Sequence, residues 1–385
     1  MTESTTVPGG RFDAFLKRIG LADDGGLRVG RAVPVLAGVC WLPLFGLTAL
    51  GGTAWGDAVD VRFLEDLSAY GRFLVALPLL LVGEKLLTNV LPSVHKYVLE
   101  TNLVPENEEQ SAETLRSRLD QQNSGLLEVL VLVLAFALPW IGLRGMAESQ
   151  AAAAATSWLF GTSAAGLSPA GWWHILVAMP LLGFLTLRWV LRYLSWSLFL
   201  RAFSKLDLQL QATHPDRTAG LGPLVITQSL FAPLFMAGSV IVAAFMGNDI
   251  LYSSVTLRIL APEIAAYVTI AFGLLISPLL VFISPLRRAK ISGALYYGAL
   301  GDSITDTFAE RWKKKDPTTL IDTADPSSVT DYTAMYDTVA SMRTFPFSMR
   351  QTIGLVVVLA IPFAPLLLTA MSLKQLLTRL LGMIV

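Results

Sequence analysis

Seven stretches of the chain are long and apolar enough to cross a membrane, because a spanning helix needs about 20 mostly apolar residues. These stretches are residues 32–52, 71–91, 125–143, 172–198, 221–246, 261–283 and 351–371. The second is the weakest of them, since Glu84 and Lys85 interrupt it. The pattern predicts an all-α, polytopic membrane protein whose 385 residues form a single membrane domain.

The basic residues between these spans predict an orientation. Segments 1–31, 93–124, 199–220 and 286–350 together hold 20 Lys and Arg residues, and the remaining loops and the C-terminal tail hold five. Cytoplasmic loops carry the excess of Lys and Arg in membrane proteins. We therefore expect the N-terminus and these four segments in the cytoplasm and the C-terminus on the periplasmic side of a bacterial inner membrane.

The polar segments also contain helical patterns, which predict a helical cytoplasmic layer. Apolar residues from Ile291 to Trp312 recur at helical spacing before Lys313, and a second helix is expected to begin near Pro326. Residues 106–122 and an amphipathic tail at 372–385 are further expected helices. The alanine-rich stretch 151–161 is expected to form a short helix on the outer surface, with a re-entrant half-helix as the alternative.

Composition agrees with a bilayer environment. Hydrophobic residues make up 54% of the chain and charged residues 15%, against about 25% charged in ordinary soluble domains. The net charge is zero, so nothing indicates a nucleic-acid partner. Cys40 is the only cysteine, which excludes a disulfide or a cysteine-based metal site within one chain.

Charged side chains inside the spans are the strongest functional signal, because each is costly in a bilayer and often marks a substrate or ion path. The candidates are Arg72, Glu84, Lys85, Glu128, Arg188 and Arg192, and all except Arg72 fall toward the cytoplasmic half. We expect Glu84 to pair with Arg188 or Arg192, either to hold helices together or to line a vestibule. Adjacent residues on a helix point roughly 100° apart, so Glu84 and Lys85 cannot share one partner.

A polar signature links the fourth and fifth spans. It contains His214, Asp216, Arg217, Gly220 and Gly222. The His-Pro-Asp tripeptide also occurs in J-domain cochaperones, but there it joins two helices of a soluble domain, so that match is rejected. Asp216 or Thr213 is expected to cap the helix of the fifth span, and an anion bound at this helix N-terminus is an alternative.

Signatures of catalysis are missing from the sequence. We find no HExxH zinc motif, phosphate-binding P-loop, GxSxG elbow or CxxC pair. His95 and His174 fall on opposite sides of the predicted membrane, which argues against a bis-histidine haem. The sequence therefore predicts no metal or cofactor, and an enzyme is the less favoured class.

Four segments resemble a family of uncharacterised integral membrane proteins that is widespread in Proteobacteria. They are Gly71–Leu80, Leu206–Gly222, Tyr297-Gly298 with the helix at 308–312, and Ser341–Arg343 with Pro346-Phe347. The resemblance covers the chain from about Arg31 onward and implies an inner-membrane location, but it implies no activity and no site residues. This chain departs from the family pattern at Ala219, where two adjacent glycines are expected, and its loop is expected to be slightly stiffer.

The leading hypothesis is a channel or transporter for a small ion or solute, acting as a homo-oligomer. Intramembrane charges, prolines within the spans and a cytoplasmic layer able to act as a gate favour it. The alternative is a membrane-anchored scaffold or signalling protein, whose cytoplasmic segments at 93–124 and 286–350 bind a protein partner. Polar residues aligned along one span would favour transport, but the fifth and sixth spans are almost purely apolar.

Overall fold

The computed structural model describes residues 11–23, 25–101, 103–108, 110–111, 114–115, 125–153, 156–161, 166–253, 255–314 and 325–370. Within these residues, nearly all regular structure is helical, apart from a short antiparallel hairpin of β1 (Ala22–Asp23) and β2 (Gly26–Leu27). The first half of the helices comprises α1 (Arg11–Arg18), α2 (Val29–Leu50), η1 (Phe63–Glu65), α3 (Leu67–Tyr70), η2 (Gly71–Ala76), α4 (Leu77–Glu100), η3 (Glu106–Glu108), α6 (Gly125–Ala153), α7 (Pro169–Trp173), η4 (His174–Ala178) and α8 (Met179–Phe203). The second half comprises α9 (Gly222–Ser229), α10 (Ala232–Tyr252), α11 (Leu257–Ile276), η5 (Ser277–Phe282), α12 (Ile283–Lys314), α13 (Asp325–Ala340), α14 (Met349–Ala360), η7 (Ile361–Leu366) and α15 (Leu367–Ala370).

Seven helices in the described residues are long and apolar enough to cross a membrane, which confirms the predicted fold class. They are Val29–Leu50, Leu67–Val94, Leu127–Gly145, Pro169–Phe203, Gly222–Tyr252, Leu257–Glu310 and Met349–Thr369. Each coincides with one predicted stretch. Several extend beyond it, because helical hydrogen bonding continues into polar residues at the ends of an apolar run. The protein is therefore a multi-pass membrane protein.

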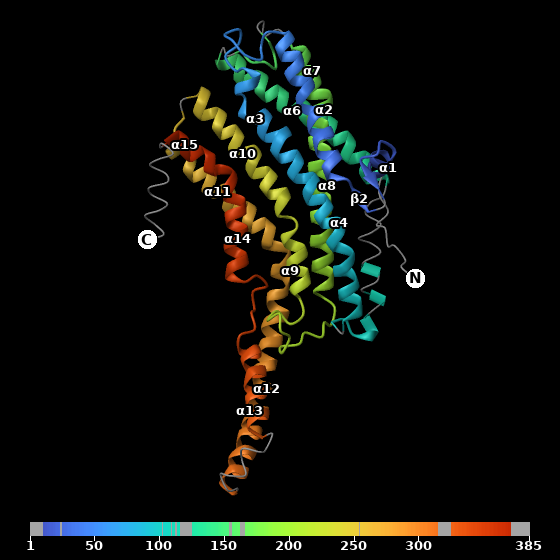
Figure 1. Ribbon diagram of the computed structural model, residues 1–385, viewed down its shortest axis with the longest axis vertical. Helices are drawn as coiled ribbons and strands as arrows, with labels where there is room; N and C mark the ends of the chain where they lie inside the picture. The colour runs from blue at the N-terminus through green and yellow to red at the C-terminus, as the bar shows by residue number, and fades with distance from the viewer. Residues whose placement is uncertain are drawn as a thin grey trace.

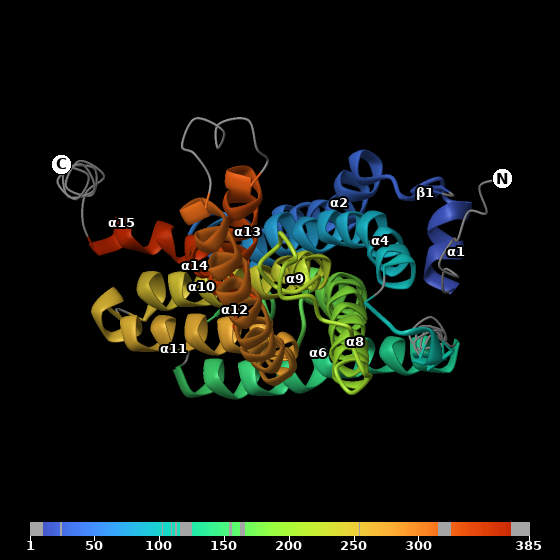
Figure 2. The same cartoon turned by 90° about the horizontal axis from the view of Figure 1, so that it is seen from below.

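We call the two ends of the bundle the N-terminal side and the opposite side. The N-terminal side holds α1, the start of α2 and the end of α11, and the opposite side holds the loops before α3 and α7 (Figure 1). Seen from below, α1 lies at one edge of the molecule and α15 at the other (Figure 2). The hairpin of β1 and β2 connects α1 to the first span, so α1 is joined to the bundle through a short link.

The sixth span contains a break that other helices repair. At Ser277 the α-helix changes to the 3-10 segment η5, in which Pro278 lacks a backbone N–H donor. The Tyr193 hydroxyl donates a hydrogen bond to the carbonyl of Leu274, and the Gln228 side chain donates to that of Leu275 at 2.6 Å. The break therefore ties the sixth span to the fourth and fifth spans, as the satisfaction of freed carbonyls in membrane helices requires.

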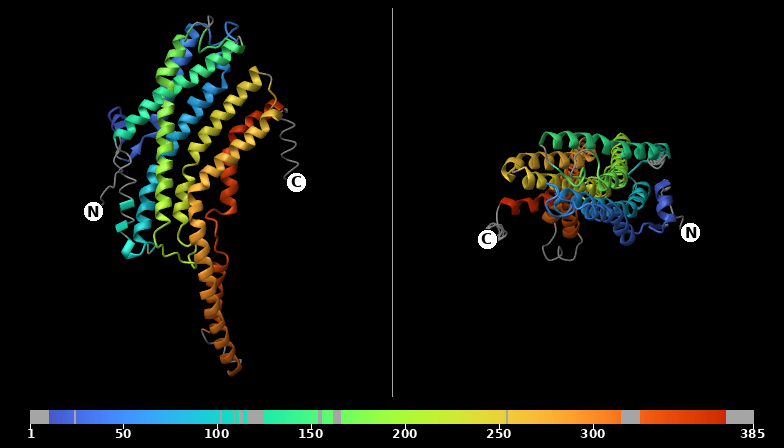
Figure 3. Two further views of the ribbon diagram at one scale, coloured as in Figure 1. Left: turned by 180° about the vertical axis from the view of Figure 1, so that it is seen from behind. Right: turned by 90° about the horizontal axis from the view of Figure 1, so that it is seen from above.

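Beyond the bundle, α12 and α13 form a two-helix arm. α12 continues the sixth span past the N-terminal side, and α13 packs back along it (Figures 1 and 3). The start of α13 at Asp325 confirms the helix expected near Pro326. At the base of the arm, the Lys290 ammonium donates to the Met342 carbonyl at 2.7 Å.

The structure corrects the expectation for residues 151–161, and the helices expected at 106–122 and 372–385 lie mostly or wholly outside the described residues. Residues 151–153 belong to the end of α6, and 156–161 form a turn in which Ser157 bridges to Val61, so the expected surface helix is wrong. The reason is that Trp158 packs into the bundle, where it is 3% exposed, instead of lying at a lipid headgroup boundary. Most of the helix expected at 106–122, and all of the tail expected at 372–385, lie outside the described residues.

Candidate functional site: two buried polar networks on one helix pair

A charge cluster lies on the N-terminal side, between α4 and α8. One carboxylate oxygen of Glu84 lies 3.0 Å from the Arg188 guanidinium and 3.1 Å from that of Arg192. The two arginines are four residues apart, so they lie on the same face of α8. The sequence predicts that Glu84 pairs with one of the two arginines. In the structure Glu84 contacts both of them at once.

The N-terminal helix α1 completes this cluster, which the sequence did not indicate. Both carboxylate oxygens of Asp13 accept hydrogen bonds from Arg188 at 2.7 Å. The backbone N–H of Phe12 donates to Glu128 at 2.7 Å, and the Phe12 ring lies 4.8 Å from the ring of Phe184 and 5.5 Å from the Arg188 guanidinium. Asp13 is in a polar segment that hydrophobicity places outside the membrane, so only its folding back brings it here.

These contacts change the interpretation of the charged candidates. Arg188 and Arg192 both point into the cluster, where one terminal nitrogen of each, Nη1, is buried without a partner among the described residues. Lys85 points elsewhere and donates to the Gly25 carbonyl in the β1–β2 hairpin. Glu84 and Lys85 therefore have separate partners, as their spacing on the helix requires.

A second polar network is buried on the opposite side, centred on Asp66 at the start of α3. One oxygen of Asp66 accepts from the Ser68 hydroxyl at 2.5 Å and from the Asn248 amide at 2.7 Å. The other accepts from the Trp158 indole at 2.9 Å. The carboxylate thereby joins the second span, the fifth span and the loop before the fourth span.

Arg72 and His174 extend this network into the bundle. The Arg72 guanidinium donates to the Ser68 carbonyl at 2.9 Å, lies 3.4 Å from His174 Nε2 and stands over the ring of Phe245 at 4.9 Å. Both side chains are almost fully buried, and His174 Nδ1 has no partner in the described part of the chain. They lie in η2 and η4, which are π-helical segments, and such segments are frequent at functional sites.

The sequence makes Arg72 a charged candidate but does not indicate its partners. A histidine next to two tryptophans at the start of a span resembles an ordinary interfacial belt. No pattern in the sequence indicates that His174 turns toward Arg72. The one usable signal was the cost of a charge inside a span, which had already made Arg72 a candidate.

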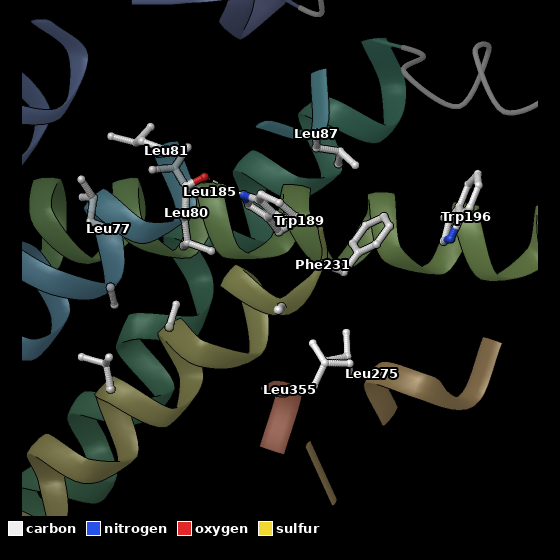
Figure 4. Close-up of a cluster of buried hydrophobic side chains, with 14 of the residues drawn as sticks. Leu77, Leu80, Leu81, Leu87, Leu185, Trp189, Trp196, Phe231, Leu275 and Leu355 are labelled. Carbon is white, nitrogen blue, oxygen red and sulfur yellow. Dashed lines mark hydrogen bonds between the residues drawn. The ribbon is translucent and has the colours of Figure 1, made fainter. Parts of the chain in front are cut away.

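An apolar layer separates the two networks along the second and fourth spans. It consists of Leu77, Leu80, Leu81, Leu182 and Leu185. Figure 4 shows four of these side chains gathered between α4 and α8, next to Trp189, whose indole donates to the Leu80 carbonyl at 3.0 Å. Arg72 and Glu84 are 12 residues apart on one continuous span, which corresponds to roughly 18 Å of helix.

The loop motif between α8 and α9 is built around Asp216. Its carboxylate accepts backbone N–H groups from Thr218 at 2.7 Å, Gly220 at 3.1 Å and Gly222 at 2.9 Å, and His214 Nδ1 lies 2.8 Å from it. Burial acts to raise the pKa of Asp216, but these backbone hydrogen bonds outweigh it and hold that pKa below its ordinary value of 3.8.

The Asp216 carboxylate therefore occupies the helix N-terminus at which a bound anion was the alternative expectation. It accepts the backbone N–H of Gly222, the first residue of α9. Arg217 does not contribute a side chain to this arrangement but adopts a left-handed backbone, with φ of 57°. Its carbonyl accepts the backbone N–H of Arg343, and the Arg343 guanidinium donates to the Asp216 carbonyl. The motif thus fixes the segment after α13 to the loop before the fifth span.

Nothing in the described residues gathers three or more His, Cys, Asp or Glu side chains in the manner of a metal site. Cys40 is fully buried in α2, with its sulfur 4.0 Å from the Ala178 carbonyl. The buried carboxylates and guanidinium groups of the two networks are suited to binding charged groups. No protein-family model, curated protein or solved structure matches this chain.

Proposed function

We propose that this protein transports a small ion or solute across the bacterial inner membrane, with its N-terminal side in the cytoplasm. The observation that carries the proposal is the pair of buried polar networks on the second and fourth spans, one toward each side, with the apolar layer between them. The excess of basic residues in the segments on the N-terminal side supports this orientation. Membership of the resembled bacterial family and assembly as a homo-oligomer are parts of the same proposal.

The positions of charged groups inside the membrane support this proposal. Buried ionisable groups in a bilayer typically pair with one another and mark ion or substrate pathways. Hydrophobic constrictions between polar regions stop conduction by excluding water. Glu84 and Arg72 toward the two ends of one span, with Leu80 between them, correspond to a closed pathway with a polar site on each side.

Flux measurements in liposomes test the proposal. Purified wild-type protein is compared with Leu80→Ala, which removes part of the apolar layer, and with Glu84→Gln, which removes one charge from the cluster. We expect Leu80→Ala to raise protein-dependent flux several-fold because a smaller side chain lowers the barrier. Glu84→Gln should change ion selectivity, because it leaves both arginines with one carboxylate fewer.

Leu86→Ala provides the matched control, since Leu86 lies on the same helix but is 47% exposed on the bundle surface. This variant should leave flux unchanged. If folded wild-type protein and folded Leu80→Ala both show no flux under any ion or solute gradient, the transport proposal is wrong.

A membrane scaffold is the second candidate, and the arm favours it. Large apolar side chains on α12 are exposed there, including Ile291, Leu295 and Tyr296. An exposed apolar face on a projecting helix is typical of a protein-interaction surface. Retention of a specific cellular partner by the intact protein, and its loss on changing Leu295 to Glu, would support this function. Absence of flux together with such a result would establish the scaffold over the transporter.

A further inference from the structure

The arginine pair on α8 has more hydrogen-bonding capacity than the bundle uses. Among the described residues, two carboxylates lie within ion-pair distance of Arg188 and Arg192, and of these two Glu84 belongs to a membrane-spanning helix. The other, Asp13, comes from α1. The buried Nη1 atoms of both arginines lack a partner in the described residues. A buried donor without a partner is unfavourable, so this pair retains the capacity to bind a further acceptor.

The helix that supplies Asp13 is attached weakly. α1 has eight residues, and an isolated helix of that length is marginal in water. Its docking depends on Asp13, on Phe12 and on Leu16, which is buried, whereas Phe15 and Ile19 are more than a third exposed. Loss of the Asp13 contact is therefore enough to shift α1 toward release.

We propose that Arg188 and Arg192 form a binding site for a small monocarboxylate solute, and that Asp13 occupies this site as a built-in competitor. The side chain of Asp13 ends in a carboxymethyl group, so the group now held by Arg188 is the chemical equivalent of acetate. Guanidinium groups are well suited to carboxylates, since their fixed donors match two oxygens. The inference rests on the proposed transport function, because it names the class of solute that would enter from the N-terminal side.

Charge balance selects a monoanion. Without Asp13, Glu84 is the one carboxylate that the described residues keep within ion-pair distance of the two arginines, while Glu128 acts electrostatically on Arg188 with and without Asp13. One bound carboxylate restores the balance that Asp13 provides, and a second negative charge would exceed it. Binding of the solute and docking of α1 therefore exclude each other, so the solute releases the helix that covers its own site.

Thermal stability in phosphatidylcholine nanodiscs tests the site without any flux measurement. The melting temperature of Asp13→Ala is recorded in sodium acetate and in sodium chloride of equal ionic strength. Acetate at a few times its Kd should raise it by roughly 2 °C, and the rise should grow with acetate concentration, as it does for a ligand that binds only the folded state. Wild-type protein should show a smaller rise than Asp13→Ala, because Asp13 competes with acetate for Arg188. The double variant Asp13→Ala with Arg188→Gln should lose the effect.

Asp23→Ala is the matched control, because Asp23 pairs with Arg28 at 3.0 Å on the exposed hairpin next to α1. It removes a carboxylate from an arginine without opening the buried site, so acetate should have no specific effect on it. An Asp13→Ala protein that responds identically to acetate and chloride would overturn the proposal.

A labelling experiment avoids any change of charge. Leu16→Cys places a thiol beneath α1, where the native side chain is 2% exposed, and the native Cys40 is fully buried. Sodium propionate should raise the rate of maleimide labelling at position 16 at least twofold over sodium chloride, because propionate displaces Asp13. Equal rates would contradict competition between the solute and α1. If both binding tests succeed and Leu80→Ala liposomes carry no ion or carboxylate, the transport proposal fails while the site stands.

Discussion

Ala219 and Asp216 show how single residues shape the loop before the fifth span. Ala219 is buried and adopts a left-handed backbone with φ of 56°, followed by Gly220 at 94°. A residue with a Cβ atom is disfavoured in that region, whereas glycine adopts it readily. The position where the family resemblance implies a glycine is thus one where this chain holds a strained alanine, and Asp216 compensates by binding the surrounding N–H groups.

Ala219→Gly should stabilise the protein by up to about 1 kcal/mol, because it relieves the left-handed strain by more than it adds to the entropy of the unfolded chain. The measurement is the melting temperature in detergent. Ala212→Gly serves as the control on the same loop, since Ala212 has no positive φ and its Cβ contacts Gly293. A fall in stability for Ala219→Gly would contradict the assignment of strain.

Asp216→Ala should destabilise the protein by about 1–3 kcal/mol, since three backbone donors lose their acceptor. The carboxylate has a lower pKa in the folded protein than in the unfolded chain. Its stabilising effect is therefore complete above about pH 4 and is lost as the pH falls through the folded-state pKa. Melting temperatures between pH 3 and 7 should fall more steeply on acidification for wild type than for Asp216→Asn.

At the scale of elements, the helices approach one another most closely where small residues lie at their contacts. Gly83 of α4 faces Pro233 of α10 and Trp189 of α8. A Cβ atom at position 83 would lie 2.7 Å from Pro233 Cβ and 3.0 Å from the Trp189 ring. Small residues permit such close packing in membrane bundles, where hydrophobicity alone does not drive association. Gly83 also lies next to Glu84, so this packing positions the charge cluster.

Gly83→Ala should lower stability by about 1–3 kcal/mol through overpacking, and it should also weaken the ion pairs of Glu84 by moving α4 outward. Gly142→Ala is the control, because a Cβ atom there meets no atom within 4 Å and alanine favours the helix. Melting temperatures of the two variants in one detergent make the comparison. Equal stability of both would contradict the close approach of α4, α8 and α10.

At the scale of the whole molecule, the arm packs mainly within itself and is joined to the bundle at its base. Lys290 and Arg343 anchor the arm to the segments around it, and Gly293 of α12 packs against Ala212 with no room for a Cβ atom. Past this base, α12 and α13 project beyond the bundle and pack against each other, as Figure 3 shows.

Replacing residues 302–333 by a short glycine-serine linker should leave the melting temperature of the bundle unchanged, because few of its packing contacts are lost. Arg343→Ala should lower that temperature, since it removes the anchor at the base of the arm. If the transport function is right, the shortened protein should also retain flux. Unfolding of the shortened protein would show that the arm contributes to the stability of the spans.

The number and position of the spans followed from the sequence by itself. Apolar runs of about 20 residues have one stable environment, and the backbone inside a bilayer satisfies its hydrogen bonds as a helix. The sequence also indicated that Glu84 meets an arginine of the fourth span, because charges are rare at that depth and only a few partners were available.

Only the tertiary structure decided which faces of the helices meet. A helix that is apolar all round carries no pattern that fixes its rotation, so the pairing of Arg72 with His174 depended on packing. The place of Asp13 was equally hidden, since hydrophobicity assigns α1 to the polar segments. Its docking results from specific contacts with Arg188, Glu128 and Phe184, which are distant in sequence and come together only in the folded bundle.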